Sequence, residues 1–277
     1  MQLFYQLLKD WWFGKFCLAT ASRGAGKTFM AALYISLKAI LFPGIRIVIA
    51  APSYRQSKFI FQEFQKFYYE SPIMQACFER EPVIGQDQAT AYTKQIGRSL
   101  KSSVKALPIG NDGSKVRGER GDVLLLDEIV HLPEEIFRTV LKPMLSTSSS
   151  PMRRVKEVEE LKKIYGDNIP KEYLTANNSY IGITSGYYQF NYWWSEIKLA
   201  WEAIKEGNHN HRLSFIPYTD LPDGFFDIDL VNTSKATDPR HVFLTEWCAR
   251  WIADSEGAFP MSLLESCRDS SVEPRSK

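Results

Sequence analysis

The segment ASRGAGKT, Ala21 to Thr28, constrains this chain more than any other feature. It lies between a short β-rich run, Lys15 to Ala21, and an apolar stretch of helical pattern, Thr28 to Leu41. Small residues at such a junction let consecutive backbone N–H groups face one anion, while a lysine and a hydroxyl reach phosphates and magnesium. The segment therefore predicts a phosphate-binding loop made of Ser22, Arg23, Gly24, Ala25, Gly26, Lys27 and Thr28.

Two positions of this loop are unusual. Ala21 stands where the common pattern has its first glycine, so the pattern leaves a glycine-rich turn that caps a helix as the alternative. Arg23 lies inside a loop that is usually neutral there. We expect Arg23 to contact the γ-phosphate or to respond to its loss, and the alternative is a solvated arginine.

A second motif, VLLLDE, places Asp127 and Glu128 at the end of a strand that is apolar on both faces. Paired carboxylates are costly there without cations or hydrogen bonds. In a phosphate-loop ATPase the first acid holds Mg²⁺ together with the loop hydroxyl, here Thr28, and the second aligns the attacking water. Acids at strand ends also occur in many other α/β proteins. Joined to the loop, the pair predicts ATP hydrolysis.

Strands and helices alternate along most of the chain. This order predicts an α/β fold with a mainly parallel central sheet flanked by helices, in the RecA-like class of phosphate-loop NTPases. We expect an ATPase domain over residues 1–220, with 146–175 as a polar insertion or flap, and a small linker or lid subdomain over 221–277. The expected strands are Lys15 to Ala21, Ile45 to Ser53, Asp122 to Glu128, Tyr180 to Gly186 and Arg212 to Tyr218. The expected helices include Thr28 to Leu41, Tyr54 to Glu70, Trp193 to Ile204 and, in the small subdomain, the amphipathic run PRHVFLTEWCARWIAD.

The net charge of +2 says little about a nucleic-acid partner, so any basic surface must be local. One basic cluster is a candidate DNA contact, with a solvated basic face as the alternative: Arg98, Lys101, Lys105, Lys115, Arg117 and Arg120. A weaker candidate lies in the flap, at Arg153, Arg154, Lys162 and Lys163. The cysteines form no CxxC pair, and His209 and His211 lack a third metal ligand nearby. No apolar run approaches the roughly 18 residues of a membrane span.

Three motifs in this order, SRGAGKT, VRGERGDVLLLDE and ITSG, resemble the ATPase domain of bacteriophage terminase large subunits. The resemblance covers roughly residues 2–250. It implies an ATP-hydrolysing, Mg²⁺-dependent motor that moves double-stranded DNA into procapsids. The implied partners are a portal protein, the procapsid, a small terminase subunit and further copies of the chain in a ring. The implied location is the host cytoplasm, outside the mature virion and without a membrane.

The resemblance also implies roles for individual residues. Arg117 corresponds to an arginine that reaches a neighbouring subunit's nucleotide. Thr184 and Ser185 correspond to the motif that senses the γ-phosphate and relays hydrolysis to DNA grip. Gln2 corresponds to the glutamine that reads adenine. The roles of Lys27, Thr28, Asp127 and Glu128 are those expected from the motifs themselves.

Members of this family continue into a nuclease domain with clustered acids. The acids of DLPDGFFDIDL are explained by turn chemistry, so we expect no nuclease activity in this chain. Two other functions remain open: a helicase-like DNA-dependent ATPase, and a non-catalytic nucleotide-binding DNA adaptor. A two-lobed helicase needs a second motor lobe, and an adaptor predicts a missing catalytic acid where this chain has Glu128.

Overall fold

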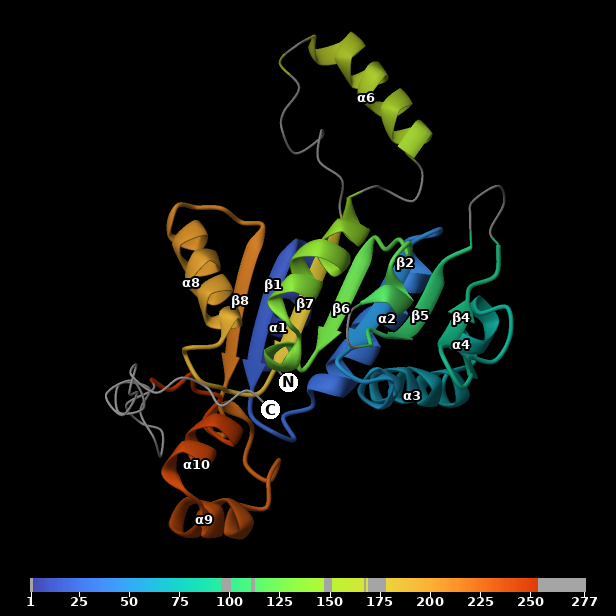
Figure 1. The fold of residues 1–277 in the computed structure, drawn as a ribbon. Coiled ribbons are helices and arrows are strands. Elements are labelled where there is room, and N and C mark those ends of the chain that lie inside the picture. Colours follow the sequence, from blue (N-terminus) through green and yellow to red (C-terminus); the bar gives the residue numbers. More distant parts are fainter. Residues whose placement is uncertain are drawn as a thin grey trace, which may run out of the picture.

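Eight strands of the described chain form one central sheet (Figure 1). The structure is a computed structural model that describes residues 2–95, 101–110, 113–146, 151–166, 168 and 178–253, without the side chains at 115, 151–154 and 157. The strands are β1 (Phe16–Ala21), β2 (Arg46–Ala51), β3 (Val83–Ile84), β4 (Ala89–Tyr92), β5 (Ser103–Pro108), β6 (Val123–Asp127), β7 (Ser179–Thr184) and β8 (His211–Ile216).

The strand order is β3-β4-β5-β2-β6-β7-β1-β8. The six strands from β5 to β8 in this order pair in parallel. The two outermost strands on one side, β3 and β4, are added antiparallel. The predicted mainly parallel α/β sheet is therefore confirmed. One strand, β7, lies between β1, which precedes the predicted phosphate loop, and β6, which carries the acid pair. This insertion is the arrangement expected of the RecA-like class.

Helices cover both faces of the sheet (Figure 1). One face carries α1 (Gln2–Phe13), α2 (Lys27–Leu41), α3 (Tyr54–Glu70) and α4 (Pro72–Cys77). The other carries α5 (Glu134–Ile136), which continues as π-helix over Phe137–Leu141 and 3₁₀ helix over Lys142–Leu145, and α8 (Tyr192–Lys205). Short 3₁₀ turns cover Ser114–Val116, Ile129–His131 and Tyr218–Asp220.

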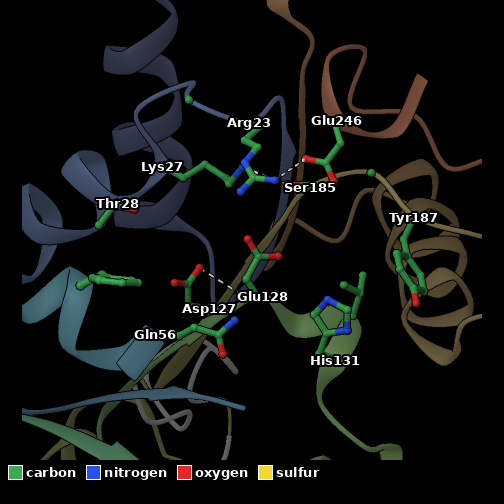
Figure 2. A pocket seen from close by; sticks show the side chains of 14 residues that line it. Arg23, Lys27, Thr28, Gln56, Asp127, Glu128, His131, Ser185, Tyr187 and Glu246 are labelled. Carbon is green, nitrogen blue, oxygen red and sulfur yellow. Dashed lines mark hydrogen bonds and ion pairs between the residues drawn. The ribbon is translucent and has the colours of Figure 1, made fainter. Parts of the chain in front are cut away.

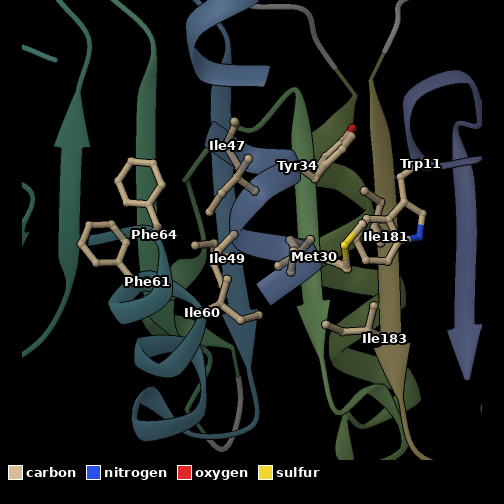
Figure 3. Packing of buried hydrophobic residues seen from close by; sticks show 14 of the residues in the cluster. Trp11, Met30, Tyr34, Ile47, Ile49, Ile60, Phe61, Phe64, Ile181 and Ile183 are labelled. Atoms are coloured by element: carbon tan, nitrogen blue, oxygen red, sulfur yellow. The ribbon is translucent and has the colours of Figure 1, made fainter. Parts of the chain in front are cut away.

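The sheet separates two hydrophobic cores because neighbouring residues of a strand point to opposite faces. In β2, Ile47 and Ile49 belong to the core under α2 and α3, whereas Val48 and Ala50 belong to the other core. Figure 3 shows the first core, where Met30 of α2 lies close over the sheet. Continuous apolar strands of this kind are typical of parallel sheets buried on both faces.

Two helices differ from the sequence expectation. Helix α1, which the sequence patterns did not indicate, spans Gln2–Phe13 and buries Trp11, whose ring meets Tyr34 edge-on at 5.9 Å. In the described part of the amphipathic run PRHVFLTEWCARWIAD, helix is confined to α10, Arg240–Glu246. Beyond it the chain leaves the helical path, with Ala249 at a φ of 52°, and the indole Nε1 of Trp251 donates to Thr20 Oγ1 at 3.0 Å.

The predicted insertion and the segment after Leu221 lie at opposite edges of the sheet (Figure 1). Helix α6 (Pro151–Tyr165) projects from the edge where β6 and β7 begin. Helices α9 (Ile228–Thr237) and α10 lie beyond the edge where the parallel strands end. Asp227, one of the acids assigned to turn chemistry, caps α9 by accepting from two backbone N–H groups. Within the described residues, no helix has the length and apolar composition to cross a bilayer.

Candidate active site

The predicted phosphate loop connects β1 to α2 at the carboxyl edge of the sheet, which is where the parallel strands end. Gly24 and Gly26 adopt φ angles of 77° and 78°, the left-handed region that favours glycine. Gly26 is the N-cap of α2, and no side chain caps this helix start. The N–H groups of the first turn of α2 are therefore not used by a side-chain cap, and the helix dipole adds positive potential there. Such a helix start is suited to bind an anion.

Lys27 lies within this loop and points toward the ends of β1 and β7. Its Nζ donates to Ala21 O at 2.9 Å, to Ser22 O at 3.1 Å and to Ser185 Oγ at 3.5 Å. Burial lowers the pKa of Lys27, and the charges of Glu128 and Asp127 oppose that shift. The ammonium group therefore lies beside both predicted acids.

The acid pair ends β6 on the opposite side of the same hollow. Asp127 is buried and accepts from the backbone N–H of Glu128 at 3.0 Å. Burial, reinforced by the charge of Glu128, raises the pKa of Asp127 to about 7, while Lys27 opposes the rise. A carboxylate held so poorly ionised is one that a nearby divalent cation stabilises, and oxygen donors are the ligands Mg²⁺ prefers. Asp127 and Thr28, which line one cavity, therefore fit a magnesium site.

Glu128 has a φ of 49°, one of two positive values among the described non-glycine residues. Such a conformation costs on the order of 1 kcal/mol or more and persists where surrounding structure imposes it. It turns the chain sharply after β6, and Figure 2 shows the Glu128 carboxylate within the cavity near Asp127. Glu128 thus lines the same cavity as Lys27 and Asp127.

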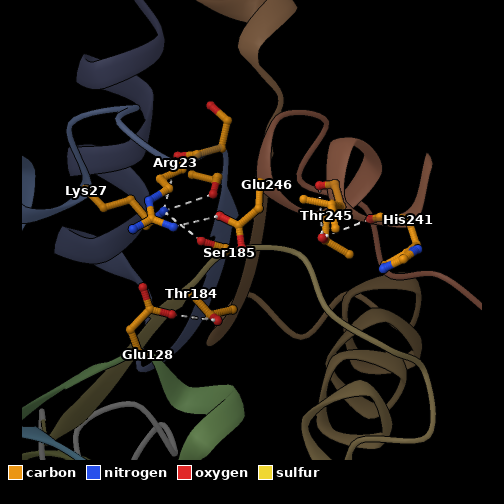
Figure 4. A network of polar contacts seen from close by, with 11 residues as sticks. Arg23, Lys27, Glu128, Thr184, Ser185, His241, Thr245 and Glu246 are labelled. Carbon is orange, nitrogen blue, oxygen red and sulfur yellow. Dashed lines mark hydrogen bonds and ion pairs between the residues drawn. The ribbon is translucent and has the colours of Figure 1, made fainter. Parts of the chain in front are cut away.

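The end of β7 connects the loop to the acids. Thr184 is fully buried, and its Oγ1 donates to Glu128 Oε2 at 3.5 Å. Its neighbour Ser185 accepts from Lys27 Nζ at the same distance. Because β7 lies between β1 and β6, these two hydroxyls reach the loop on one side and Glu128 on the other (Figure 4).

Arg23 extends from the loop toward the end of α10. Its side chain is 82% exposed, and its Nη1 lies 3.8 Å from Glu246 Oε2. Its backbone N–H donates to Glu246 O at 2.7 Å, which fixes the loop to the last residue of α10. In this position Arg23 borders the cavity and pairs with an acid. Gln2 and Arg117 are exposed and do not line the cavity.

The cavity has a volume of about 510 Å³ (Figure 2). Apart from the predicted site residues and Gly186 of the ITSG motif, six lining residues were not identified from the sequence: Gln56, Phe59, Val130, His131, Tyr187 and Glu246. Gln56 had a local signal, because Ser53 and Gln56 form the capping box of α3 immediately after β2. The others had no local signal, since only the fold brings them to the loop.

The loop after β7 packs tightly against the segment that follows α10. A Cβ at Gly186 would lie 2.3 Å from Arg250 O and 2.8 Å from Thr245 O, closer than real contacts allow. Gly186 N donates to Thr245 O, and the backbone of Ile252 bonds to Tyr187 and Gln189. The end of α10 is thus fixed to the phosphate loop, and α10 and the segment after it are fixed to the loop after β7.

The basic cluster is partly neutralised by neighbouring acids. Lys101 pairs with Glu79 at 2.7 Å and Lys105 with Glu119 at 3.0 Å. Arg120 donates to Ser146 Oγ at 3.4 Å. Arg98 and the side chains of Lys115, Arg153 and Arg154 lie outside the described residues, and Lys162 and Lys163 are exposed on α6.

Comparison with known proteins gives one family and several similar folds. The sequence model of the family described as "Terminase large subunit, T4likevirus-type, N-terminal" matches residues 18–167. No curated protein matches the chain by sequence. The ATPase domain of the Thermus phage P74-26 large terminase is 17% identical, with a TM-score of 0.59 over 90% of this chain and 97% of that one.

Two longer proteins share the fold. A large terminase from a thermophilic bacteriophage, in complex with ADP, is 9% identical, with a TM-score of 0.61 over 91% of this chain and 53% of that one. The HK97 bacteriophage large terminase is 14% identical, with a TM-score of 0.56 over 91% of this chain and 51% of that one. This chain thus spans about half the length of either. At these identities the matches show a common fold.

Proposed function

The chain belongs to the T4-type terminase large subunit family, and we propose that it hydrolyses ATP to drive double-stranded DNA into a viral procapsid. The observation that carries the proposal is the position of Lys27, Asp127 and Glu128 around one cavity at the carboxyl edge of the sheet. The phage terminase with ADP, which shares the fold, has also been solved with ATP-gamma-S. The proposed nucleotide is therefore ATP, bound with Mg²⁺.

The phosphate loop, the acid pair and the end of β7 each have a role that follows from their position. Loop N–H groups and Lys27 bind the phosphates, exchanging the contacts of Nζ with Ala21 O and Ser22 O for phosphate oxygens. Thr28 and Asp127 hold Mg²⁺, which, when bound, neutralises charge that develops on the phosphates. Glu128 orients the water that attacks the γ-phosphate. Thr184 and Ser185 then respond to hydrolysis of the γ-phosphate, because Thr184 contacts Glu128 and Ser185 contacts Lys27.

The decisive experiment is steady-state ATP hydrolysis by wild type and Glu128→Gln, with and without duplex DNA. We expect a loss of about a hundredfold or more in rate while nucleotide binding persists, because the amide keeps the shape but not the charge. Glu135→Gln is the matched control, since Glu135 is exposed on the nearby α5 and does not line the cavity. Full turnover by Glu128→Gln would remove Glu128 from the catalytic role.

We also propose that the active form is a ring of copies on a portal protein and procapsid in the host cytoplasm, with a small terminase subunit as a further partner. Arg117 is exposed and does not line the cavity of its own chain, as a residue acting on a neighbour's nucleotide would be. Mixing Arg117→Ala with Glu128→Gln should restore part of the turnover, because some interfaces then combine an intact Glu128 with an intact arginine. Mixtures no more active than either variant alone would exclude this role.

A further inference from the structure

A short 3₁₀ turn, Ile129–His131, follows the acid pair directly and ends with an unusual gap in its hydrogen bonding. The N–H of His131 donates to Glu128 O at 3.0 Å, which closes the chain on the residue whose φ is 49°. A further bond of the same kind would join the N–H of residue 133 to Val130 O. Pro133 has no N–H, so the turn itself supplies no such donor to this carbonyl of a buried residue.

The missing donor comes from Asn191, the N-cap of α8. Its Nδ2 donates to Val130 O at 2.9 Å, and its Oδ1 accepts from the backbone N–H of Trp193 at 3.0 Å. The backbone N–H of Asn191 in turn donates to Tyr188 O at 3.1 Å. Because both ends of the side-chain amide have partners, the amide has one orientation and ties the turn to the loop after β7.

Two further contacts join the same turn to β7 and the loop after it. Ile129 packs on Gly182 of β7, where an added Cβ would lie 3.1 Å from Ile129 Cγ2. The ring of His131 meets that of Tyr187 edge-on at 5.7 Å, at the wall of the cavity (Figure 2). These contacts involve side chains of the turn, whereas the amide of Asn191 holds its backbone.

We propose that Asn191 is a positioning residue for ATP hydrolysis: by holding Val130 O, it keeps Glu128 in the left-handed conformation that directs its carboxylate into the cavity. The inference rests on the proposed function, since it presumes that Glu128 orients the attacking water. Residues other than glycine disfavour this conformation, so the surrounding contacts must impose it. Without the amide of Asn191 the turn relaxes, and a displacement of about 1 Å at a catalytic group costs up to about a hundredfold in rate.

The bond from Asn191 is better formed than the direct contact between β7 and the catalytic acid. Thr184 Oγ1 lies 3.5 Å from Glu128 Oε2, a long distance for a hydrogen bond, whereas the 2.9 Å between Asn191 Nδ2 and Val130 O is the usual one. The contact of Thr184 reaches the end of a rotatable side chain. The contact of Asn191 fixes the backbone from which that side chain starts, so it has the larger influence on the direction of the carboxylate.

The test uses Asn191→Asp, which preserves the cap of α8 and removes the donor. Aspartate caps helices as well as asparagine does, but its ionised carboxylate cannot donate to Val130 O. We expect kcat for ATP to fall about tenfold or more, with KM within about twofold of that of wild type, because the phosphate loop is untouched.

Gln189→Glu is the matched control, since it makes the same amide-to-carboxylate change in the same loop. Gln189 Nε2 donates to Trp251 O at 3.0 Å and not to the turn after Glu128. We expect this variant to keep kcat within about twofold of wild type. Both variants should lower the melting temperature by a similar amount, about 5 °C, because each loses one hydrogen bond.

A second measurement does not depend on turnover. Amide hydrogen exchange reports on the turn through the N–H of His131, which is bonded to Glu128 O. This amide should exchange about tenfold faster or more in Asn191→Asp and at the wild-type rate in Gln189→Glu. The double variant Asn191→Asp, Glu128→Gln should have the kcat of Glu128→Gln alone, because a positioning residue has no effect once the group that it positions is lost.

Distinct outcomes separate this inference from the proposed function. A wild-type kcat in Asn191→Asp would overturn it, as would a loss that multiplies with the loss in Glu128→Gln. Unchanged exchange at His131, or an equal fall of kcat in Gln189→Glu, would overturn it as well. Full turnover by Glu128→Gln would instead count against the proposed function, and exchange at His131 would still decide whether Asn191 holds the turn.

Discussion

The two edges of the central sheet differ in how their loops are held. At the carboxyl edge, β1, β6, β7 and the segment after α10 contact one another through buried polar groups, among them Thr20, Asp127 and Thr184. At the opposite edge, α6 projects outward with exposed side chains such as Ile164, 73% exposed. Of the two edges, only the carboxyl edge is held rigidly enough for catalysis, since a reacting group must be positioned to within a fraction of an ångström.

Glycine replacement should give the largest contrast between the two edges. Gly186→Ala forces a Cβ against the backbone of Arg250 and Thr245, so we expect a loss of about 3 kcal/mol or more in the free energy of unfolding. Gly166→Ala, at the end of α6, has a φ of 61° but nothing within 4 Å of its Cβ, so the cost is about 1 kcal/mol. Urea unfolding of both variants measures this. Equal losses would mean that the loop after β7 yields as easily as the end of α6.

The next effect concerns the charge held at the carboxyl edge. The pKa of Asp127 is raised from 3.8 to about 7, so the folded state binds a proton that the unfolded state releases. Stability from this group is therefore full below about pH 4 and is lost as pH rises toward 7. In magnesium-free buffer, Asp127→Asn should abolish this decline and gain on the order of 2 kcal/mol at pH 8 over wild type.

The control for this titration is Asp223→Asn, because Asp223 is exposed. Its unfolding free energy should follow that of wild type across the same pH range. Added Mg²⁺ should stabilise wild type more as pH rises through 7 and should not stabilise Asp127→Asn, since an amide replaces the charged ligand. If the free energy of unfolding of wild type does not change between about pH 4 and 8, the pKa of Asp127 is not raised in the folded protein.

The sequence was most informative where chemistry and secondary structure are both local. The strand, loop and helix around Lys27 and the buried strand ending at Asp127 were predicted because each carries its pattern within a few residues. The strand order places Ser185, at the end of β7, between the phosphate loop and the acids. That order is a property of the fold, and no local sequence pattern predicts it. The family resemblance supplied Thr184 and Ser185 in its place.

Other features could not be predicted because they arise from distant contacts. Glu246 is far from Arg23 in the sequence, and only the path of the chain after α10 brings their side chains to 3.8 Å. That same path ended the expected helix at Glu246, since the buried hydrogen bond between Trp251 and Thr20 competes with continued helix. The helix α1 was missed for a different reason: its apolar spacing is local, but its first turn holds no acidic residue that would indicate a helix start.

The smallest expected change in stability lies on the projecting helix. Lys162 and Lys163 are exposed in the last turn of α6, so the double variant Lys162→Ala, Lys163→Ala should change the free energy of unfolding by less than about 0.5 kcal/mol. If these two lysines contact DNA phosphates, the variant binds duplex DNA more weakly, and the salt dependence of that binding falls by up to about two charges. Glu159→Gln, which removes a charge of opposite sign from the same helix, is the control and should not reduce that dependence. A double variant with unchanged affinity and salt dependence would leave α6 without a part in DNA binding, and the basic cluster that includes Lys101, Lys105 and Arg120 would remain the candidate for the DNA contacts.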